Sequence, residues 1–285
     1  MDASHWPTFP FRPFIPPLLI LVLVGCAGQP QAPSVEPTAR PNASAASMNS
    51  AGETEPALPE APILFQPQFL WDDATVTREG TGFFAKTAGG QIAAVSSVQY
   101  LRGDRPTLRE ATWLTVTTDE PVVTFTRHWG EPGQGGSLAP TDLRDDYLLL
   151  PAKQHRVPAK APLELDPRAS PNRNERVWLP VKDIDAANGY RAVKGKVISN
   201  QTKKFIVVDL QQQLPLESLN GSPVISQQTG KVVGVLSRGG RLGENTFLIL
   251  TPVSALRQAI ADAEQTIPLT KAFAATPRLP SDNAG

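Results

Sequence analysis

The sequence predicts an all-β fold, arranged as a barrel or a sandwich and followed by one helix near the C-terminus. Short runs rich in β-branched and aromatic residues recur between turn residues, which is typical of many short strands. The 29 prolines and 21 glycines among 285 residues fit a chain with many turns. Helical periodicity is confined to one segment, "TPVSALRQAIADAEQ", residues 251–265.

The predicted strands lie between about residue 80 and residue 250. In chain order they are "GTGFFAK", "QIAAVS", "ATWLTVTT", "VVTFTRHW", "DYLLLPA", "RVWLPV", "YRAVKGKVIS", "KKFIVVDL", "GSPVIS", "KVVGVLS" and "NTFLIL". The helix that follows is expected to begin with Thr251 as its N-cap and Pro252 at its first position. Val253, Leu256 and Ile260 recur at three- to four-residue spacing, so we expect them to face the core.

The N-terminal segment has the features of a secretion signal. Arg12 precedes the uncharged run "PFIPPLLILVLVG", which has the length of a signal peptide. The run ends in "LVGCAG", in which Leu23, Val24, Gly25 and Cys26 resemble the lipobox of bacterial lipoproteins. This resemblance implies that residues 1–25 are a signal peptide and that Cys26, the only cysteine, is lipidated (palmitate) and anchors the chain to a membrane. An uncleaved anchor helix and a buried cysteine are the alternatives.

Composition divides the rest of the chain into three parts. Residues 26–62 begin with the lipidated cysteine and are rich in Pro, Ala and Ser, which predicts a flexible tether. Residues 63–268 contain the predicted strands and the helix and form the folded domain, and residues 269–285 are expected to be a disordered tail. The chain is thus expected in the bacterial cell envelope. Because Ala27 follows the lipidated cysteine, the periplasmic face of the outer membrane is expected in a cell with two membranes.

The charge balance argues against nucleic acid as a partner. The 27 basic and 27 acidic residues give a formal net charge of +0, so we expect a protein or peptide partner that is recognised by shape. Outside the predicted signal peptide the histidines are His128 and His155, and neither has a cysteine or carboxylate at metal-ligand spacing. The sequence therefore predicts no metal and no cofactor.

Three segments resemble, in order, the landmarks of trypsin-like (chymotrypsin-fold) serine proteases of peptidase family S1 in the PA clan. They are "GTGFFAKTAGGQIAAVSSVQYL", "DDYLLLPA" and "SLNGSPVISQQTGKVVGVLSRGG", and a closing helix follows them. The resemblance spans roughly Arg78 to Ala263, and it implies two packed six-stranded β-barrels with a C-terminal helix. It also implies a catalytic site at the positions of a histidine base, an acid and a serine nucleophile.

The residues at those positions differ from the pattern. The resemblance places Ser97 at the base and Asn220 at the nucleophile, while Asp146, or its neighbour Asp145, falls on the acid. A serine hydroxyl does not accept a proton near neutral pH, and an amide is not a nucleophile. In the family the backbone N–H groups that form the oxyanion hole would here belong to Ser218 and Asn220.

The degenerate triad favours an inactive relative of these proteases, a pseudoprotease that binds a peptide or a protein by strand addition. The alternative is a divergent active serine endopeptidase that uses His128 or His155 with a serine in another register, for which Ser218 and Ser222 are the candidates. A third possibility is an all-β structural lipoprotein unrelated to proteases, with "NGSP" an ordinary β-turn.

Overall fold

The computed structural model describes residues 57–87, 89–101, 103–132, 146–202, 204–216, 218–263 and 265–275. All of them belong to one compact unit, Gly52–Gly285. The first half contains β1 (Phe65–Trp71), β2 (Val76–Arg78), β3 (Phe83–Lys86), β4 (Ile92–Ser96), β5 (Leu108–Thr115), β6 (Pro121–Phe125), β7 (Arg127–Trp129), β8 (Leu148–Ala152) and β9 (Leu163–Glu164). Short 3₁₀ helices lie at Gln99–Leu101 and Gln154–Arg156.

The second half contains β10 (Arg176–Lys182), β11 (Tyr190–Thr202), β12 (Phe205–Asp209), β13 (Pro223–Ser226), β14 (Val232–Leu242) and β15 (Asn245–Pro252). It is followed by α1 (Val253–Asp262), β16 (Thr266–Pro268) and α2 (Leu269–Ala272). None of the helices among the described residues is long and apolar enough to cross a membrane.

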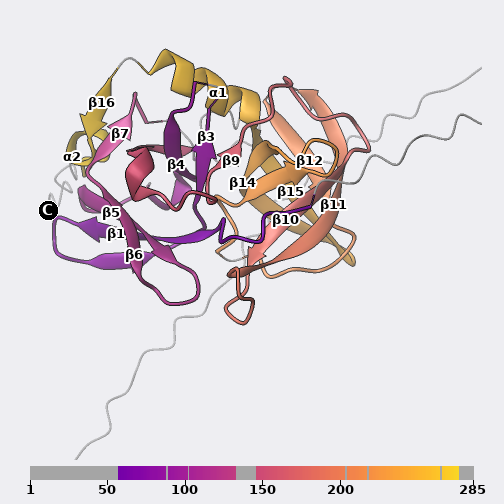
Figure 1. The fold of residues 1–285 in the computed structure, drawn as a ribbon, viewed down its shortest axis with the longest axis horizontal. Coiled ribbons are helices and arrows are strands. Elements are labelled where there is room, and N and C mark those ends of the chain that lie inside the picture. Colours follow the sequence, from indigo (N-terminus) through magenta and orange to yellow (C-terminus); the bar gives the residue numbers. More distant parts are fainter. Residues whose placement is uncertain are drawn as a thin grey trace, which may run out of the picture. The chain divides into compact units, whose positions relative to one another are not determined.

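The strands form two barrel-like bodies, which lie side by side in Figure 1. The second is a closed barrel in the order β10-β11-β12-β15-β14-β13. The first consists of the sheets β2-β1-β5-β6 and β8-β4-β3-β9, and an isolated bridge between Phe65 and Gly82 joins β1 to the segment before β3. The predicted all-β class, the barrel architecture and the C-terminal helix are confirmed, although the first barrel is closed by packing as well as by strand pairing.

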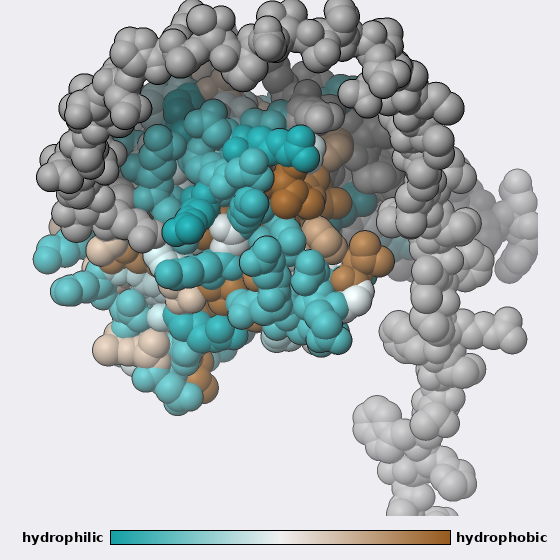
Figure 2. All heavy atoms as spheres, turned by 90° about the vertical axis from the view of Figure 1, so that its right-hand side faces the viewer, coloured by the Kyte–Doolittle hydropathy of each residue, from teal (hydrophilic) through white to brown (hydrophobic). Residues whose placement is uncertain are grey.

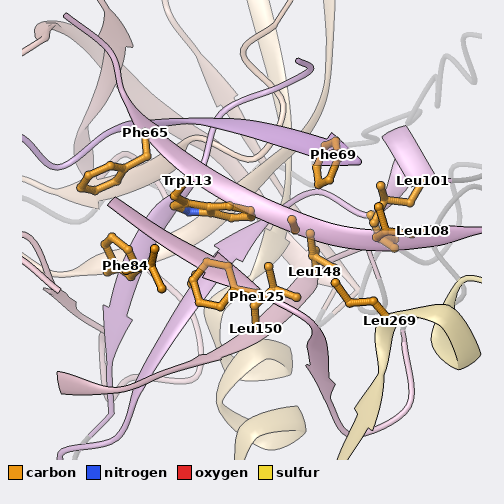
Figure 3. Packing of buried hydrophobic residues seen from close by; sticks show 14 of the residues in the cluster. Phe65, Phe69, Phe84, Leu101, Leu108, Trp113, Phe125, Leu148, Leu150 and Leu269 are labelled. Carbon is orange, nitrogen blue, oxygen red and sulfur yellow. The ribbon is translucent and has the colours of Figure 1, made fainter. Parts of the chain in front are cut away.

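Aromatic side chains fill the space between the two sheets of the first barrel. Trp113 of β5 is fully buried near the middle of this cluster, between Phe65 and Phe69 (Figure 3). Phe65 meets Phe84 edge-on with ring centroids 4.8 Å apart, and Trp113 meets Phe125 in the same way at 5.4 Å. Such edge-to-face pairs add to the stabilisation from apolar burial.

The helix α1 covers the junction of the two barrels. Val253, Leu256 and Ile260 are its buried residues, which confirms the predicted apolar stripe. They share a core cluster with strand residues from both barrels, among them Val95 and Val235. Burying one helix face against both barrels fixes their relative position, which the site described below requires.

The start of α1 differs from the prediction. Pro252 is the N-cap and no side chain caps the helix. Thr251, the predicted cap, lies in β15 instead. Its buried hydroxyl donates to the carbonyl oxygen of Asp146 at 3.2 Å. The hydroxyl therefore stabilises the site and not the helix terminus.

The ordered domain extends beyond both predicted boundaries. On the N-terminal side, Leu58 packs against the core and the Tyr190 hydroxyl donates to the Pro59 carbonyl. On the C-terminal side, Leu269 and Phe273 are buried in the first barrel. The boundary predicted at residue 268 therefore lies inside the domain, because α2 buries two apolar residues, four apart, that form too short a pattern to indicate a helix in the sequence.

Lys182, at the end of β10, links the two barrels. Its Nζ donates to Gln66 Oε1 at 2.6 Å and to the Gly80 carbonyl at 2.7 Å. Both partners belong to the first barrel and both are uncharged, and within the described part of the chain Lys182 forms no ion pair. Burial lowers the pKa of Lys182 to about 8.

The lowered pKa of Lys182 predicts that the free energy of unfolding depends on pH. Unfolded lysine keeps its proton until its ordinary pKa of 10.5, so between about pH 8 and pH 10 the unfolded chain binds more protons and folding is favoured by rising pH. We expect the free energy of unfolding to increase by roughly 1–2 kcal/mol over that range. Urea denaturation at several pH values should show this increase in the wild type and in Lys153→Met, an exposed control, but not in Lys182→Met.

Candidate functional site

A buried carboxylate surrounded by hydroxyl groups lies where the two barrels meet. Ser97 Oγ donates to Asp146 Oδ1 at 2.9 Å, and Ser237 Oγ donates to Asp146 Oδ2. The side chains of these three residues are almost completely inaccessible to solvent. Burial raises the pKa of Asp146, and the hydrogen bonds from Ser237 and Ser97 oppose that shift. Ser97, which the sequence comparison aligned with the base, is thus hydrogen-bonded to Asp146, which it aligned with the acid.

Strand geometry brings these three residues together. Ser97 directly follows β4 and Asp146 precedes β8, and these strands pair so that Ser96 lies opposite Leu148. Ser237 lies in β14, where the pairing with β15 shifts by one residue. A bulge of this kind turns a side chain away from the regular pleat, and here it directs Ser237 to the carboxylate. Sequence reasoning found Ser97 and Asp146 but missed Ser237, because nothing in "VLSRGG" marks a bulge.

The raised pKa of Asp146 predicts the effect of removing its charge. A carboxyl whose folded pKa exceeds its unfolded value stabilises the fold below the unfolded pKa of about 3.8, and this contribution is lost as the pH rises through the folded pKa. We therefore expect Asp146→Asn to unfold a few degrees above the wild type at neutral pH, with no such advantage near pH 3. Asp146→Ala, which leaves the hydroxyls of Ser97 and Ser237 without their acceptor, should unfold at a lower temperature than the wild type. Thermal denaturation of the three proteins across this pH range checks both expectations.

The turn that contains Asn220 is fixed to the first barrel. The Thr81 N–H donates to the Asn220 carbonyl at 2.9 Å, and Thr81 Oγ1 donates to the Ser218 carbonyl at 2.8 Å. The Gly221 N–H donates to the Leu236 carbonyl of β14 at 2.6 Å. The turn is therefore held between β3 and β14, beside the end of β4 where Ser97 lies.

Two residues of this turn have left-handed backbone conformations. Ser218 has φ 64° and Gly221 has φ 90°. A Cβ at Gly221 would lie 2.1 Å from the Thr81 carbonyl oxygen and 2.9 Å from the Ser97 nitrogen, so only glycine fits. This close approach brings the Asn220 turn next to Ser97 and Asp146. The three residues predicted for one site therefore lie together.

Tyr100 lies beside the turn and was not predicted. It belongs to the 3₁₀ helix that follows Ser97, and its ring packs on Gly80: a Cβ there would lie 2.4 Å from Tyr100 Cε2 and 2.9 Å from the Asn220 carbonyl oxygen. Burial and the charge of Glu79 raise the pKa of Tyr100 to about 12, although hydrogen bonding with the Asn220 side chain acts in the opposite direction. The phenol ring thus lies against Gly80, next to the Asn220 side chain.

The histidines and serines of the alternative catalytic arrangement are placed elsewhere. His128 is buried, with Nδ1 2.9 Å from the Gly130 carbonyl and Nε2 accepting the Leu149 N–H at 3.2 Å. His155 lies in the 3₁₀ helix beyond the far end of β8, at the opposite end of that strand from Asp146. Ser222 is fully buried with its hydroxyl unpaired, whereas Ser218 is exposed. These hydrogen bonds of His128 join it to the backbone of Gly130 and Leu149 and not to a serine.

Several predicted features lie outside the described residues. They include Asp145, the other candidate acid, Cys26 with its signal peptide, and the tether as far as residue 56. Over the residues that the structure does describe, no group of His, Cys, Asp and Glu could hold a metal ion.

One edge of β14 is open next to the turn. β13 pairs with β14 only to Val235, whereas β15 pairs with it to Leu242, opposite Asn245. A two-residue turn joins Leu242 to Asn245, so these two residues are the hydrogen-bonded pair that closes the hairpin. In an antiparallel pair hydrogen-bonded and non-hydrogen-bonded positions alternate, so the backbone N–H and C=O groups of Gly239 and Arg241 point away from β15. Among the described residues no strand pairs with β14 along this outer edge.

Leu216 determines the shape of the surface beside this edge. A Cβ at Gly239 would lie 2.5 Å from Leu216 Cδ2, so the leucine packs directly on the glycine. An apolar side chain therefore occupies the space above β14 beside the open edge. This arrangement favours contact with an extended backbone over the burial of a large side chain.

Comparison with solved structures finds protease folds. A scabies mite inactivated protease paralogue (S-D1) is 13% identical with a TM-score of 0.49, covering 71% of this chain and 94% of the other. Catalytically active tobacco etch virus protease complexed with product is 14% identical (TM-score 0.48, 75% and 86%), and human heparin binding protein is 13% identical (TM-score 0.48, 73% and 93%). These are similarities of fold. No protein-family model matches the sequence, and no curated protein matches it.

Proposed function

We propose that the protein is a lipid-anchored cell-envelope protein whose barrel domain binds an extended peptide or protein segment without cleaving it. The observation that carries the proposal is the pair of residues at the positions on which cleavage depends. Ser97, at the position that the resemblance assigns to the base, donates a hydrogen bond to Asp146, and Asn220 stands at the position that it assigns to the nucleophile. Because triad members act as a unit, the loss of one key member lowers the rate by roughly a millionfold.

The backbone around this site supports the relation to proteases. Ser218 falls on a glycine of the family's nucleophile motif and has φ 64°, a conformation that glycine favours. Gly221 falls on the glycine after the nucleophile and has φ 90°. The turn thus retains left-handed backbone conformations, which cost free energy in residues other than glycine. The residue at its tip, Asn220, cannot attack a substrate. A turn that retains this backbone conformation without a nucleophile is consistent with binding of a peptide or protein segment.

The open edge of β14 supplies the binding mode. An extended peptide that added to this edge would pair with the outward N–H and C=O groups of Gly239 and Arg241. Substitution by proline removes a backbone N–H, so Arg241→Pro should weaken the binding of peptides selected from a displayed library by about tenfold or more. Arg241→Ala is the matched control: both variants lose the bond from the Arg241 guanidinium to the Leu214 carbonyl, but only the proline variant loses the N–H.

Fluorescence anisotropy with a selected peptide measures this difference. Retained binding in Arg241→Ala together with weakened binding in Arg241→Pro supports strand addition. Equal affinity in the two variants contradicts it, provided that circular dichroism shows both to be folded.

Membrane attachment is tested separately. If Cys26 carries lipid, bacteria that express the full chain should incorporate labelled palmitate into it, and the protein should fractionate with membranes. Cys26→Ser should remove the label and release the protein. Retention of the label in that variant would contradict the proposed anchor.

A further inference from the structure

The closed barrel has a cavity on its outer face, separate from the Ser97 and Asn220 site. Its volume is about 490 Å³, within the usual range for small-ligand sites. The walls come from β10, β11, β12 and the chain before β10 and after β13, and they include Asn174, Arg176, Lys194, Lys196, Asp209 and Gln227. The side of the molecule on which β11 lies is largely hydrophilic, as Figure 2 shows.

Three cationic side chains converge on this cavity. Arg176 lies directly opposite Lys196 in the pairing of β10 with β11, and Lys194 is two residues along β11 on the same face. Like charges opposite each other on neighbouring strands repel. Lys194 Nζ lies 4.9 Å from the centroid of the Trp178 ring, which holds that charge at the cavity wall. An anion in the cavity would relieve the repulsion.

The cavity wall also contains one carboxylate, Asp209, which lies opposite Lys196 in the pairing of β11 with β12. The hydrogen bonds to this carboxylate come from uncharged groups. Asp209 Oδ1 accepts the Gln211 N–H at 2.9 Å, and Asp209 Oδ2 accepts from Asn245 Nδ2 at 3.4 Å. Within the described part of the chain, Arg176, Lys194 and Lys196 form no ion pair in the structure. The cavity therefore has an excess of positive charge in a chain whose formal net charge is +0.

Polar amide groups fix the rest of the wall. Gln227 is buried; its Nε2 donates to the Val177 carbonyl at 3.1 Å and its backbone N–H donates to the Arg176 carbonyl at 2.9 Å. Asn174 has a left-handed φ of 68°, and its N–H donates to the Val197 carbonyl at 2.8 Å. These bonds fix the Gln227 side chain and the backbone of Asn174 beside the three cations. Amide and cationic groups are the donors that an oxyanion requires.

We propose that this cavity binds a multivalent oxyanion, a small ligand with at least two phosphate or carboxylate groups. The cavity exceeds the size of a single oxyanion, and its cations are distributed over two strands. A ligand with two anionic groups would therefore engage more of them than a single group would. The planar guanidinium of Arg176 can form a bidentate pair with one phosphate or carboxylate group, and Lys194 and Lys196 can bind a second such group. This site does not depend on the peptide-binding role of β14.

The test uses two probe anions, inorganic pyrophosphate and propane-1,2,3-tricarboxylate, in calorimetric titrations of the purified protein at low and at physiological salt. We expect at least one probe to bind with a dissociation constant of about 1 mM or lower at low salt, and binding to weaken as salt is added. Binding of pyrophosphate alone assigns phosphate groups to the ligand, binding of the tricarboxylate alone assigns carboxylates, and binding of both assigns the general oxyanion class.

Variants separate this site from general charge attraction. Arg176→Gln combined with Lys196→Gln should weaken binding by about tenfold or more, whereas Arg191→Gln, an exposed residue of β11 that does not line the cavity, should change it by less than about twofold. If the double variant does not fold, the same binding measurement is made with Lys194→Gln alone, which should also weaken binding. Absence of binding by the wild type up to about 10 mM, or an equal loss in Arg191→Gln, overturns the proposal.

Discussion

Replacing Ser97 by His and Asn220 by Ser is expected to leave the domain inactive until Tyr100 is also shortened. The two substitutions restore a base and a nucleophile, and Asp146 is already placed to orient the imidazole. The Tyr100 ring, however, packs on Gly80 next to the Asn220 turn, and Tyr100 is hydrogen-bonded to the Asn220 side chain. We therefore expect the ring to obstruct proton transfer from a serine at position 220 to a histidine at position 97.

Adding Tyr100→Ala to the two substitutions should therefore produce slow hydrolysis of an activated ester, on the order of 100-fold above the double variant. Tyr100→Phe in the same background is the matched control, because it keeps the ring and removes only the hydroxyl. Initial rates at neutral pH, with labelling by a serine-directed phosphonate, measure the effect. Activity in the Phe variant equal to that in the Ala variant would show that the ring is no obstacle.

Gly221→Ala is expected to be the most destabilising single substitution at the site. The new methyl group would lie 2.1 Å from the Thr81 carbonyl oxygen and 2.5 Å from Ser96 Oγ, and the backbone has φ 90°. The left-handed conformation costs about 1–2 kcal/mol, and the overlap adds about 1–3 kcal/mol. Urea denaturation should show a loss of about 3 kcal/mol or more, with weakened peptide binding because the turn must move away from Thr81.

Gly243→Ala separates the two contributions. Gly243 has φ 59°, but a Cβ there meets nothing within 4 Å. It should therefore lose only the conformational part, about 1 kcal/mol. Similar losses in both variants would mean that the turn does not pack against Thr81 and Ser96 as the structure has it.

The sequence predicts the strands well where apolar residues are continuous or alternate clearly. β1 is not predicted from the sequence, because Pro67 interrupts it and proline is rare inside strands. The structure accommodates it opposite Trp113 of β5. Phe65, Phe69 and Trp71 on this strand are buried, so the alternation was present in the sequence on either side of the proline.

Part of the candidate site could also be predicted. Ser97, Asp146 and Asn220 came from a linear comparison of motifs, and the structure places them together. Ser237 and Thr251 could not be found in this way, because their hydroxyls reach Asp146 through a bulge in β14 and through the end of β15. Tyr100 depends on the close approach of the Asn220 turn to Gly80, a contact between residues far apart in the sequence.

The central claim is that the domain binds without catalysing hydrolysis. Reaction of the purified protein with a fluorophosphonate probe for serine hydrolases, followed by intact mass and peptide mapping, tests it most directly. We predict no specific adduct under conditions in which an active serine protease is fully labelled. An adduct on a single serine, blocked by denaturation, would contradict the account and identify a divergent serine endopeptidase.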